Sequence, residues 1–223
     1  MKLMKGPTIP QPKILVVDDW YSKEEEERVW KELEFYTQPN KFDRAENGNV
    51  ALDEDNKVLG EHFRVHLDQL YTPKARDLLN ISDILNYHSK LQTPQFHEAI
   101  KKANPTYYRM FRETNITYSL ISYYDANDYY KPHHDIFMWT VLIWFYKQPK
   151  AYTGGDLIFP EYNNFRVESL HNRMIAFPSY YLHGVETINL PEDKTNKGLG
   201  RYTITHFLHT HAGGKYWENE LIK

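Results

Sequence analysis

Between residues 116 and 146 the chain reads ITYSLISYYDANDYYKPHHDIFMWTVLIWFY, a run rich in β-branched and aromatic side chains. Such residues favour strands. We predict three strands here, separated by polar segments such as Asp125-Ala126-Asn127, whose residue types are typical of turns. The predicted strands are Ile116–Tyr124, Tyr129–Asp135 and Thr140–Tyr146.

The same pattern continues to the C-terminal side of this run. Short apolar or alternating segments predict five more strands: Gly155–Phe159, Asn164–Glu168, Met174–Phe177, His183–Ile188 and Tyr202–Leu208. Eight short strands separated by turn residues indicate a two-sheet sandwich or jelly roll. The predicted fold class is therefore mostly β with flanking helices.

The first half of the chain is predicted to be mainly helical. Ser22 and Glu25 have the spacing of a capping box, in which each side chain bonds a backbone N–H group of the other residue. Thr72-Pro73 and Thr93-Pro94 each place an N-cap residue before proline at the first helical position. We expect these helices to pack on one outer face of the sheets. The predicted helices are 23–36, 73–79, 83–90 and 94–103.

We predict one domain over residues 1–223. A loose, lysine- and proline-bearing arm occupies residues 1–13. Residues 14–110 hold a strand at Ile14–Val17, the buttressing helices and a long polar loop near 40–60. The jelly-roll core occupies residues 111–211, and a C-terminal tail follows over 212–223.

Composition excludes several functional classes. The 223 residues include 27 Lys+Arg and 30 Asp+Glu, for a net charge of −3, which argues against a surface that coats nucleic acid. The absence of cysteine excludes disulfide scaffolds, thiolate metal sites and cysteine nucleophiles. No apolar run approaches the roughly 20 residues of a spanning helix, and the N-terminus lacks the apolar segment of a secretory signal. We therefore expect a cytoplasmic protein with no membrane partner.

A candidate metal site lies in the strand region. Side chains alternate along a strand, so His133 and Asp135 are expected on one face and His134 on the other. His183 follows an apolar strand and a turn, and a sandwich fold can bring it beside this pair. Two imidazoles and one carboxylate form a facial triad, which suits non-haem Fe(II). Arg201 heads a later strand, and its guanidinium matches a carboxylate in bidentate fashion, as a small dicarboxylate co-substrate would require.

These segments together resemble the 2-oxoglutarate/Fe(II)-dependent oxygenases, and within them the prolyl 4-hydroxylase-like branch. The resemblance covers residues 124–208, somewhat over a third of the chain. The first block is similar to the family's Tyr-x-x-Gly-x-x-Tyr-x-x-His-x-Asp pattern. The segments that carry it are YDANDYYKPHHD at 124–135, Gly154-Gly155-Asp156-Leu157, RMIAFP at 173–178, His183-Gly184-Val185 and GRYTIT at 200–205.

The resemblance implies a double-stranded β-helix core and an oxygenase reaction. The enzyme would hydroxylate a substrate C–H bond with Fe(II), 2-oxoglutarate and O2, release succinate and CO2, and use ascorbate as a candidate reductant. Arg201 would bind the far carboxylate of 2-oxoglutarate, with Tyr124 donating a hydrogen bond to it. The implied iron ligands are His133, Asp135 and His183, and the implied co-substrate residues are Arg201, Tyr124 and Thr203.

Three features depart from the family pattern. Asn127 and Asn172 stand where the family has glycine, and asparagine adopts positive φ more readily than most residues, so turns are still expected there. The interval between His183 and Arg201 is longer than in prolyl hydroxylases, and we interpret residues 189–200 as a lengthened hairpin loop.

The sequence leaves the substrate and the oligomeric state open. A peptidyl side chain such as proline is the first hypothesis, because tyrosine-rich walls suit an extended peptide. A small molecule or free amino acid is the second, and a non-catalytic metal-binding jelly roll is the third. A nucleic-acid demethylase is disfavoured, since Phe207 stands where that group carries a further arginine. Trp139 and Thr140, just after the predicted metal-binding strand, are candidates for contact with substrate or co-substrate, and one of Tyr129 and Tyr130 is expected to face the site.

Overall fold

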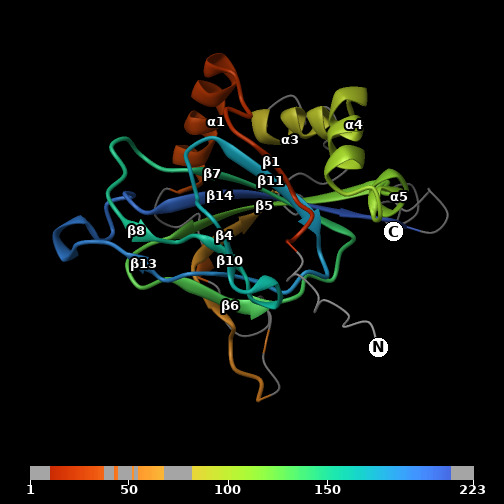
Figure 1. Ribbon diagram of the computed structural model, residues 1–223. Coiled ribbons are helices and arrows are strands. Elements are labelled where there is room, and N and C mark those ends of the chain that lie inside the picture. The colour runs from red at the N-terminus through yellow and green to blue at the C-terminus, as the bar shows by residue number, and fades with distance from the viewer. Residues whose placement is uncertain (1–10, 38–42, 45–51, 53–54, 68–81, 212–223) are drawn as a thin grey trace, which may run out of the picture.

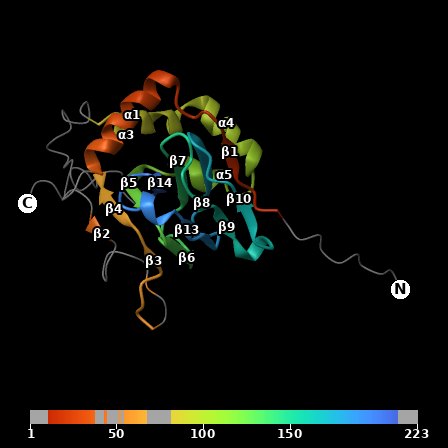
Figure 2. The ribbon, with the colours of Figure 1, turned by 90° about the vertical axis from the view of Figure 1, so that its left-hand side faces the viewer.

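The structure, a computed structural model, describes residues 11–37, 43–44, 52, 55–67 and 82–211. Two antiparallel sheets face each other, and the helices of the first half cover the outer face of the larger sheet (Figures 1 and 2). This arrangement confirms the predicted mostly β fold with a jelly-roll core and helices on one face. None of the described helices is long and apolar enough to cross a membrane.

The larger sheet has seven strands and the smaller has five. In spatial order the larger sheet contains β1 (Leu15–Val17), β11 (Arg173–Pro178), β7 (Trp139–Phe145), β14 (Arg201–His209), β5 (Ile116–Tyr124), β4 (Phe63–His66) and β2 (Asp43–Arg44). The smaller contains β10 (Phe165–Val167), β9 (Leu157–Phe159), β12 (His183–Val185), β6 (Tyr129–His133) and β3 (Gly60–Glu61). A separate two-stranded ribbon pairs β13 (Ile188–Asn189) with β8 (Thr153–Gly154).

The described helices begin where their caps predict. In α1 (Lys23–Tyr36), Ser22 Oγ accepts a hydrogen bond from the Glu25 amide, and the Ser22 amide donates to the Glu25 carboxylate. α4 (Pro94–Ala103) begins after the Thr93 cap. Both predictions are confirmed. The remaining helical elements are α3 (Asp83–Tyr87), α5 (Tyr108–Arg112) and the 3-10 turns η2 (His88–Gln92), η3 (Pro160–Tyr162) and η4 (Glu192–Lys194).

Several sequence boundaries differ from the structure. The helix predicted near 83–90 is α-helical only to Tyr87 and then tightens into η2. The strand predicted from Gly155 begins only at Leu157, because Gly155 has a φ of 74°, outside the range of a strand. The strand predicted over 183–188 divides into β12 and β13. The short elements α5, β2, β3 and β4 were not predicted. The loop predicted near 40–60 was wrong at β2 and at the start of β3, where the backbone pairs with β4 and β6. The helix predicted over 73–79 lies outside the described residues.

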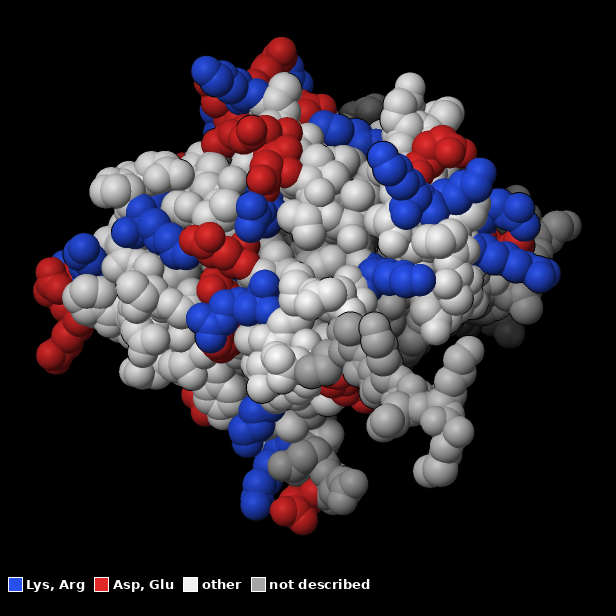
Figure 3. Space-filling model, viewed as in Figure 1, with Lys and Arg blue, Asp and Glu red and all other residues white. Residues whose placement is uncertain are grey.

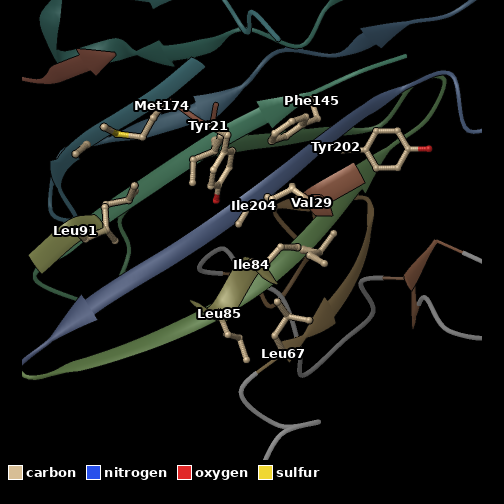
Figure 4. Packing of buried hydrophobic residues seen from close by; sticks show 14 of the residues in the cluster. Tyr21, Val29, Leu67, Ile84, Leu85, Leu91, Phe145, Met174, Tyr202 and Ile204 are labelled. Atoms are coloured by element: carbon tan, nitrogen blue, oxygen red, sulfur yellow. The ribbon is translucent and has the colours of Figure 1, made fainter. Parts of the chain in front are cut away.

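The larger sheet separates two hydrophobic cores. On its outer side, Val29 of α1 and Ile84 of α3 pack with Phe145, Tyr202 and Ile204 of the sheet (Figure 4). On its inner side a second cluster lies between the two sheets. Because neighbouring residues of a strand point to opposite faces, each central strand contributes apolar side chains to the helices and other side chains to the sandwich interior.

Two asparagines hold left-handed turns where glycine was expected. Asn127 has φ of 68° and Asn172 has φ of 58°, which confirms that asparagine supplies these turns. The buried Asn172 side chain also accepts a hydrogen bond from the Tyr21 amide (2.9 Å) and donates one to the Tyr21 carbonyl oxygen (2.8 Å). Asn172 therefore ties the segment that leads into α1 to the sheet.

Replacing Asn172 separates its two roles. Asn172→Ala loses the paired hydrogen bonds and places a Cβ-bearing residue at positive φ, so we expect it to lower the free energy of unfolding by about 3 kcal/mol. Asn172→Gly loses the same bonds without the backbone penalty and should cost roughly 1 kcal/mol less. Urea denaturation of the two variants and the parent measures this. Equal losses would show that the backbone conformation has no share in the effect.

Candidate active site

A pocket of about 480 Å³ opens between the two sheets. Alternate residues of the larger sheet line it, and they lie side by side across the strands. Arg201 of β14 is paired with Tyr124 of β5, and Thr203 with Ser122. The residues between them, such as Tyr202 and Ile204, point the other way into the helix-covered core. The smaller sheet closes the pocket from the opposite side through β6, β9 and β12.

The three predicted metal ligands meet at one wall of this pocket. His133 ends β6, His183 begins β12, and the two are direct cross-strand partners. Asp135 lies two residues beyond β6, with its carboxylate oxygens 3.4 Å from His133 Nε2 and 3.3 Å from His183 Nε2. The three candidate ligand atoms all lie within 4.8 Å of one another. This spacing allows one cation to contact all three.

Backbone carbonyls orient both imidazoles. His133 Nδ1 donates to the Lys131 carbonyl oxygen and His183 Nδ1 to that of Tyr181, each at 2.8 Å. Because Nδ1 is occupied by a backbone carbonyl, Nε2 is the nitrogen that each ring directs at the shared site, and it is the atom that would ligate a metal ion. Fixing the tautomer through the second nitrogen is the usual arrangement of a metal-binding histidine.

The carboxylate between the imidazoles is held in its charged form. Burial alone would raise the pKa of Asp135, but the charge of His183 and the hydrogen bonds from both histidines outweigh it and hold this pKa well below its usual range. Thr140 Oγ1 also donates to Asp135 Oδ2 at 2.6 Å and lies 2.8 Å from Ser179 Oγ. Thr140, the candidate for substrate or co-substrate contact, thus lines the pocket beside the triad.

Strand alternation was the wrong reason for the position of Asp135. β6 ends at His133, and the chain then bends so that the Asp135 amide donates to the Ser179 carbonyl oxygen at 3.0 Å. His134 still turns away from His133 and Asp135, because its Nδ1 donates to the Tyr180 carbonyl oxygen at 2.8 Å. The bend, rather than the pleat, sets the carboxylate between the imidazoles.

The other expected neighbours divide into two groups. Tyr130 stacks on the His133 ring with centroids 3.8 Å apart, so it is the tyrosine that faces the site. Trp139 does not reach the pocket. It is fully buried on the helix side of β7 and packs edge-on against Phe111 at 5.5 Å. The expectation for Trp139 is therefore wrong, because it sits one residue out of phase with Thr140 on the same strand.

Arg201 and Thr203 present buried donors at the far side of the pocket. Arg201 is only 1% exposed, and its guanidinium lies 4.3 Å from the centre of the Tyr124 ring and donates to the Gly155 carbonyl oxygen. Within the described chain, Arg201 Nε and Thr203 Oγ1 have no hydrogen-bond partner. Burial lowers the pKa of Arg201, yet a guanidinium stays protonated in proteins.

An anionic ligand fits these donors. Buried polar groups without partners cost free energy, and a carboxylate beside Arg201 and Thr203 would remove that cost. Burial raises the pKa of Tyr124 above its ordinary value, so its hydroxyl stays protonated and able to donate. The metal triad and these donors open on one pocket, as a metal-chelating dicarboxylate requires. The residues thus fit Fe(II) and 2-oxoglutarate.

β4 and the residue before it form a wall that the sequence analysis missed. His62, Arg64 and His66 line the pocket, and His62 stacks on the Tyr124 ring with centroids 4.8 Å apart and planes 12° apart. Phe63 and Val65 alternate with them and pack on the helix-side core. This period-two alternation of polar and apolar residues was the signal of a half-buried strand.

Comparison with known proteins agrees with this geometry. The family model described as the 2OG-Fe(II) oxygenase superfamily matches residues 119–209, which include all six predicted site residues. No curated protein matches the chain. The match thus lies within the jelly-roll core, which carries the candidate site.

Solved structures of prolyl hydroxylases have similar folds. A prolyl-4-hydroxylase from Pseudomonas putida has a TM-score of 0.59 and 14% identity, covering 90% of this chain and 94% of its own. A prolyl hydroxylase from Trichoplax adhaerens, in complex with a hypoxia inducible factor oxygen degradation domain peptide, has a TM-score of 0.59 and 14% identity over 88% and 83%. The 2OG complex of a viral collagen prolyl hydroxylase from Paramecium Bursaria Chlorella virus-1 has a TM-score of 0.51 and 9% identity over 89% and 97%. At these identities the likeness concerns the fold.

Removing the carboxylate should abolish metal binding. Asp135→Ala takes away the anionic ligand and leaves two neutral imidazoles, so we expect the Kd for Fe(II) to rise at least about 100-fold under anaerobic titration. His134→Ala is the matched control, because His134 turns away from the triad; its Kd should stay within about threefold of the parent. Circular dichroism checks folding. Equal weakening by both substitutions would contradict the assigned triad.

Substitutions at the far side of the pocket should act on the co-substrate alone. Arg201→Gln removes the buried charge, and we expect the Kd for 2-oxoglutarate to rise by about 100-fold with the metal loaded. Thr203→Val removes one neutral donor and should cost about fivefold, and Thr203→Ser should restore most of it. Metal affinity measured in parallel should not change. A loss of metal binding in these variants would place their role elsewhere.

Proposed function

Because residues 119–209 match the model of the 2OG-Fe(II) oxygenase superfamily, we propose that the protein hydroxylates a C–H bond of a peptidyl side chain, with proline as the first candidate. It uses Fe(II), 2-oxoglutarate and O2 and releases succinate and CO2. The observation that carries the proposal is the single pocket that joins the His133, Asp135 and His183 triad to the buried donors of Arg201 and Thr203.

The residues of the chain position the reactants. Bound Fe(II) and 2-oxoglutarate supply the oxidising chemistry, and the protein supplies binding and orientation. His133, Asp135 and His183 would hold the metal ion, and a triad of this kind leaves coordination positions open to ligands in the pocket. Arg201 and Thr203 hold the far carboxylate of the keto acid. Apolar side chains of Leu142, Leu157 and Val185 line the pocket between the sheets and exclude water from it.

The rim of the pocket is apolar and aromatic. Phe137 stacks on Phe207 with ring centroids 4.4 Å apart and lies 5.5 Å from the Tyr118 ring, and all three line the pocket. Ile136, directly after the ligand Asp135, is 86% exposed. An apolar group such as the proline ring gains free energy by leaving water for such a rim, which favours a side chain of this kind as the substrate group.

The charge distribution supports a peptide rather than a nucleic acid. On the face shown in Figure 3, lysine and arginine side chains are interspersed with aspartate and glutamate. Nucleic acids are bound by continuous basic surfaces that neutralise several phosphates. The overall net charge of −3 points the same way. A protein of similar fold, the Trichoplax adhaerens prolyl hydroxylase, is found in complex with a peptide fragment, which supports a peptide as the substrate class.

A turnover assay tests the proposal. Purified protein with Fe(II), ascorbate and 2-oxoglutarate is given proline-containing peptides, the same peptides with each proline replaced by alanine, or free proline. We expect succinate in proportion to peptides that gain one oxygen atom, with the oxygen on proline, and little turnover with the alanine peptides. Phe137→Ala, which removes the stacked rim ring, should raise the KM for the peptide about fivefold and leave that for 2-oxoglutarate unchanged. Succinate formed only with free proline would move the substrate class to small molecules.

A further inference from the structure

Basic and imidazole side chains form one wall of the pocket. Arg64 and His66 of β4 line it, as does His62 just before this strand. We name Arg64 and His66 the basic wall. Both residues are partly buried, and Arg64 Nη2 is almost entirely shielded from solvent. The metal triad and the donors of Arg201 and Thr203 do not involve these two side chains.

The backbone around the basic wall is paired with both sheets. β3 pairs with β6, Gly60 opposite Tyr130, and β4 pairs with β5, Arg64 opposite Ser122. Over residues 60–66 the chain therefore crosses from the smaller sheet to the larger one along one edge of the sandwich (Figure 2). A Cβ atom at Gly60 would lie 2.7 Å from Tyr130 Cδ2, so glycine allows the two strands to approach closely there. These pairings fix the basic wall on the pocket.

The strand register separates the basic wall from the donors for the co-substrate. Arg64 and Thr203 both lie opposite Ser122 of β5, on its two sides. Neighbouring strands are about 4.8 Å apart, so the Cα atoms of Arg64 and Thr203 are about 10 Å from each other. The two groups of donors are therefore distinct parts of one pocket.

Charge favours an anion at the basic wall. Among the described residues that line the pocket, Asp135 is the only carboxylate, and it belongs to the metal triad. A guanidinium shielded from water binds an ionised carboxylate through two parallel hydrogen bonds, which are stronger than those to a neutral group. The imidazole of His66 adds a further N–H donor. The basic wall thus suits a carboxylate.

The co-substrate does not need this wall. One end of 2-oxoglutarate serves the metal, and the other fits Arg201 and Thr203, so both of its carboxylates are placed elsewhere in the pocket. A third carboxylate in the same pocket comes from the substrate.

The basic wall lies beside the aromatic rim of the pocket. His66 is opposite Leu120 of β5. Two residues before Leu120, Tyr118 packs on Phe137 at the rim, with ring centroids 5.5 Å apart. From the strand spacings, the Cα atom of Tyr118 is about 8 Å from that of His66 and about 14 Å from that of Arg64. About two to four residues of extended peptide cover these distances.

We propose that Arg64 and His66 bind a carboxylate of the peptide substrate, that of an aspartate or glutamate about two to four residues from the hydroxylated one. The inference rests on the proposed function for the identity of the reacting residue, whereas the anion site does not depend on the reaction. The α-carboxylate at a peptide C-terminus has the same chemistry, and the experiment separates the two sources.

Peptide binding tests the site without turnover. The protein loaded with Fe(II) and 2-oxoglutarate is titrated without O2 with capped eleven-residue peptides of alanine and glycine that have one central proline. A glutamate is placed at each position on either side of the proline, and each peptide has a glutamine counterpart. We expect the Kd of the best glutamate peptide to be at least about tenfold below that of its glutamine form. Equal Kd values throughout, or no binding by any peptide, would overturn the proposal.

A truncated peptide distinguishes the side chain from the chain end. It ends in alanine with a free α-carboxylate at the position of the preferred glutamate. We expect it to bind less tightly than the glutamate peptide, because its carboxylate is held on the backbone and lacks the reach of the side chain. Tighter binding of the truncated peptide would overturn the assignment to aspartate or glutamate.

Variants assign the effect to the basic wall. Arg64→Gln should raise the Kd of the glutamate peptide about tenfold and leave that of the glutamine peptide unchanged, and His66→Leu should raise the former about threefold. Unchanged binding of the glutamine peptide also shows that each variant is folded. Arg64→Glu should prefer the same peptide with lysine in place of glutamate. An unchanged preference for glutamate in Arg64→Glu would overturn the proposal.

Two controls separate the basic wall from other effects. Arg166→Gln removes one positive charge at β10, on the opposite edge of the smaller sheet from β3, and should leave all peptide Kd values within about twofold of the parent. Arg64→Gln should likewise leave the Kd for 2-oxoglutarate unchanged. A rise as large as that expected for Arg201→Gln would make Arg64 a co-substrate residue and overturn the proposal.

Turnover separates this inference from the proposed function. With O2 supplied, the preferred glutamate peptide should gain one oxygen atom with a KM at least about tenfold below that of its glutamine form and a similar kcat. Hydroxylation without this preference would overturn the anion site and leave the proposed function standing. Binding that depends on Arg64 without any hydroxylation would do the reverse. An oligothymidylate that binds through Arg64 more tightly than the acidic peptides would overturn the carboxylate in favour of phosphate.

Discussion

The rest of the site depends on one buried carboxylate held between two imidazoles. Asp135 Oδ1 and Oδ2 lie 3.4 Å and 3.3 Å from the Nε2 atoms of His133 and His183. Taking a charge out of water is costly unless it is paired and hydrogen-bonded. Here Thr140 and the two histidines supply those partners. The carboxylate therefore stays anionic in a mostly apolar sandwich, which a divalent cation at this position requires.

The larger sheet allows this polar site to coexist with a stable core. Its central strands β5, β7 and β14 are buried on both faces, but the two faces differ in kind. One face packs on the helices with mostly apolar side chains, together with the buried, hydrogen-bonded pair Ser119 and His206. The other carries Arg201 and Thr203 into the pocket, one residue away from Tyr202 and Ile204, which belong to the helix-side core. Because strand periodicity is two, a slip of one residue in β14 would exchange these sets and destroy both the core and the site.

The sequence by itself determined the elements that local chemistry controls. The capping box at Ser22 and Glu25 bounded α1, Thr93-Pro94 began α4, the alternation of apolar residues located β5, and asparagine supplied the left-handed turns at 127 and 172. It also identified the triad residues and Arg201, because two histidines, an aspartate and an arginine follow one another in the order of the family's motifs. Only the tertiary structure decided how these residues meet: the bend after His133 that turns Asp135 inward, the phase that buries Trp139 on the helix side, and the neighbouring strand that stacks His62 on Tyr124. These features depend on contacts between segments far apart in the chain, and short-range patterns carry no information about such contacts.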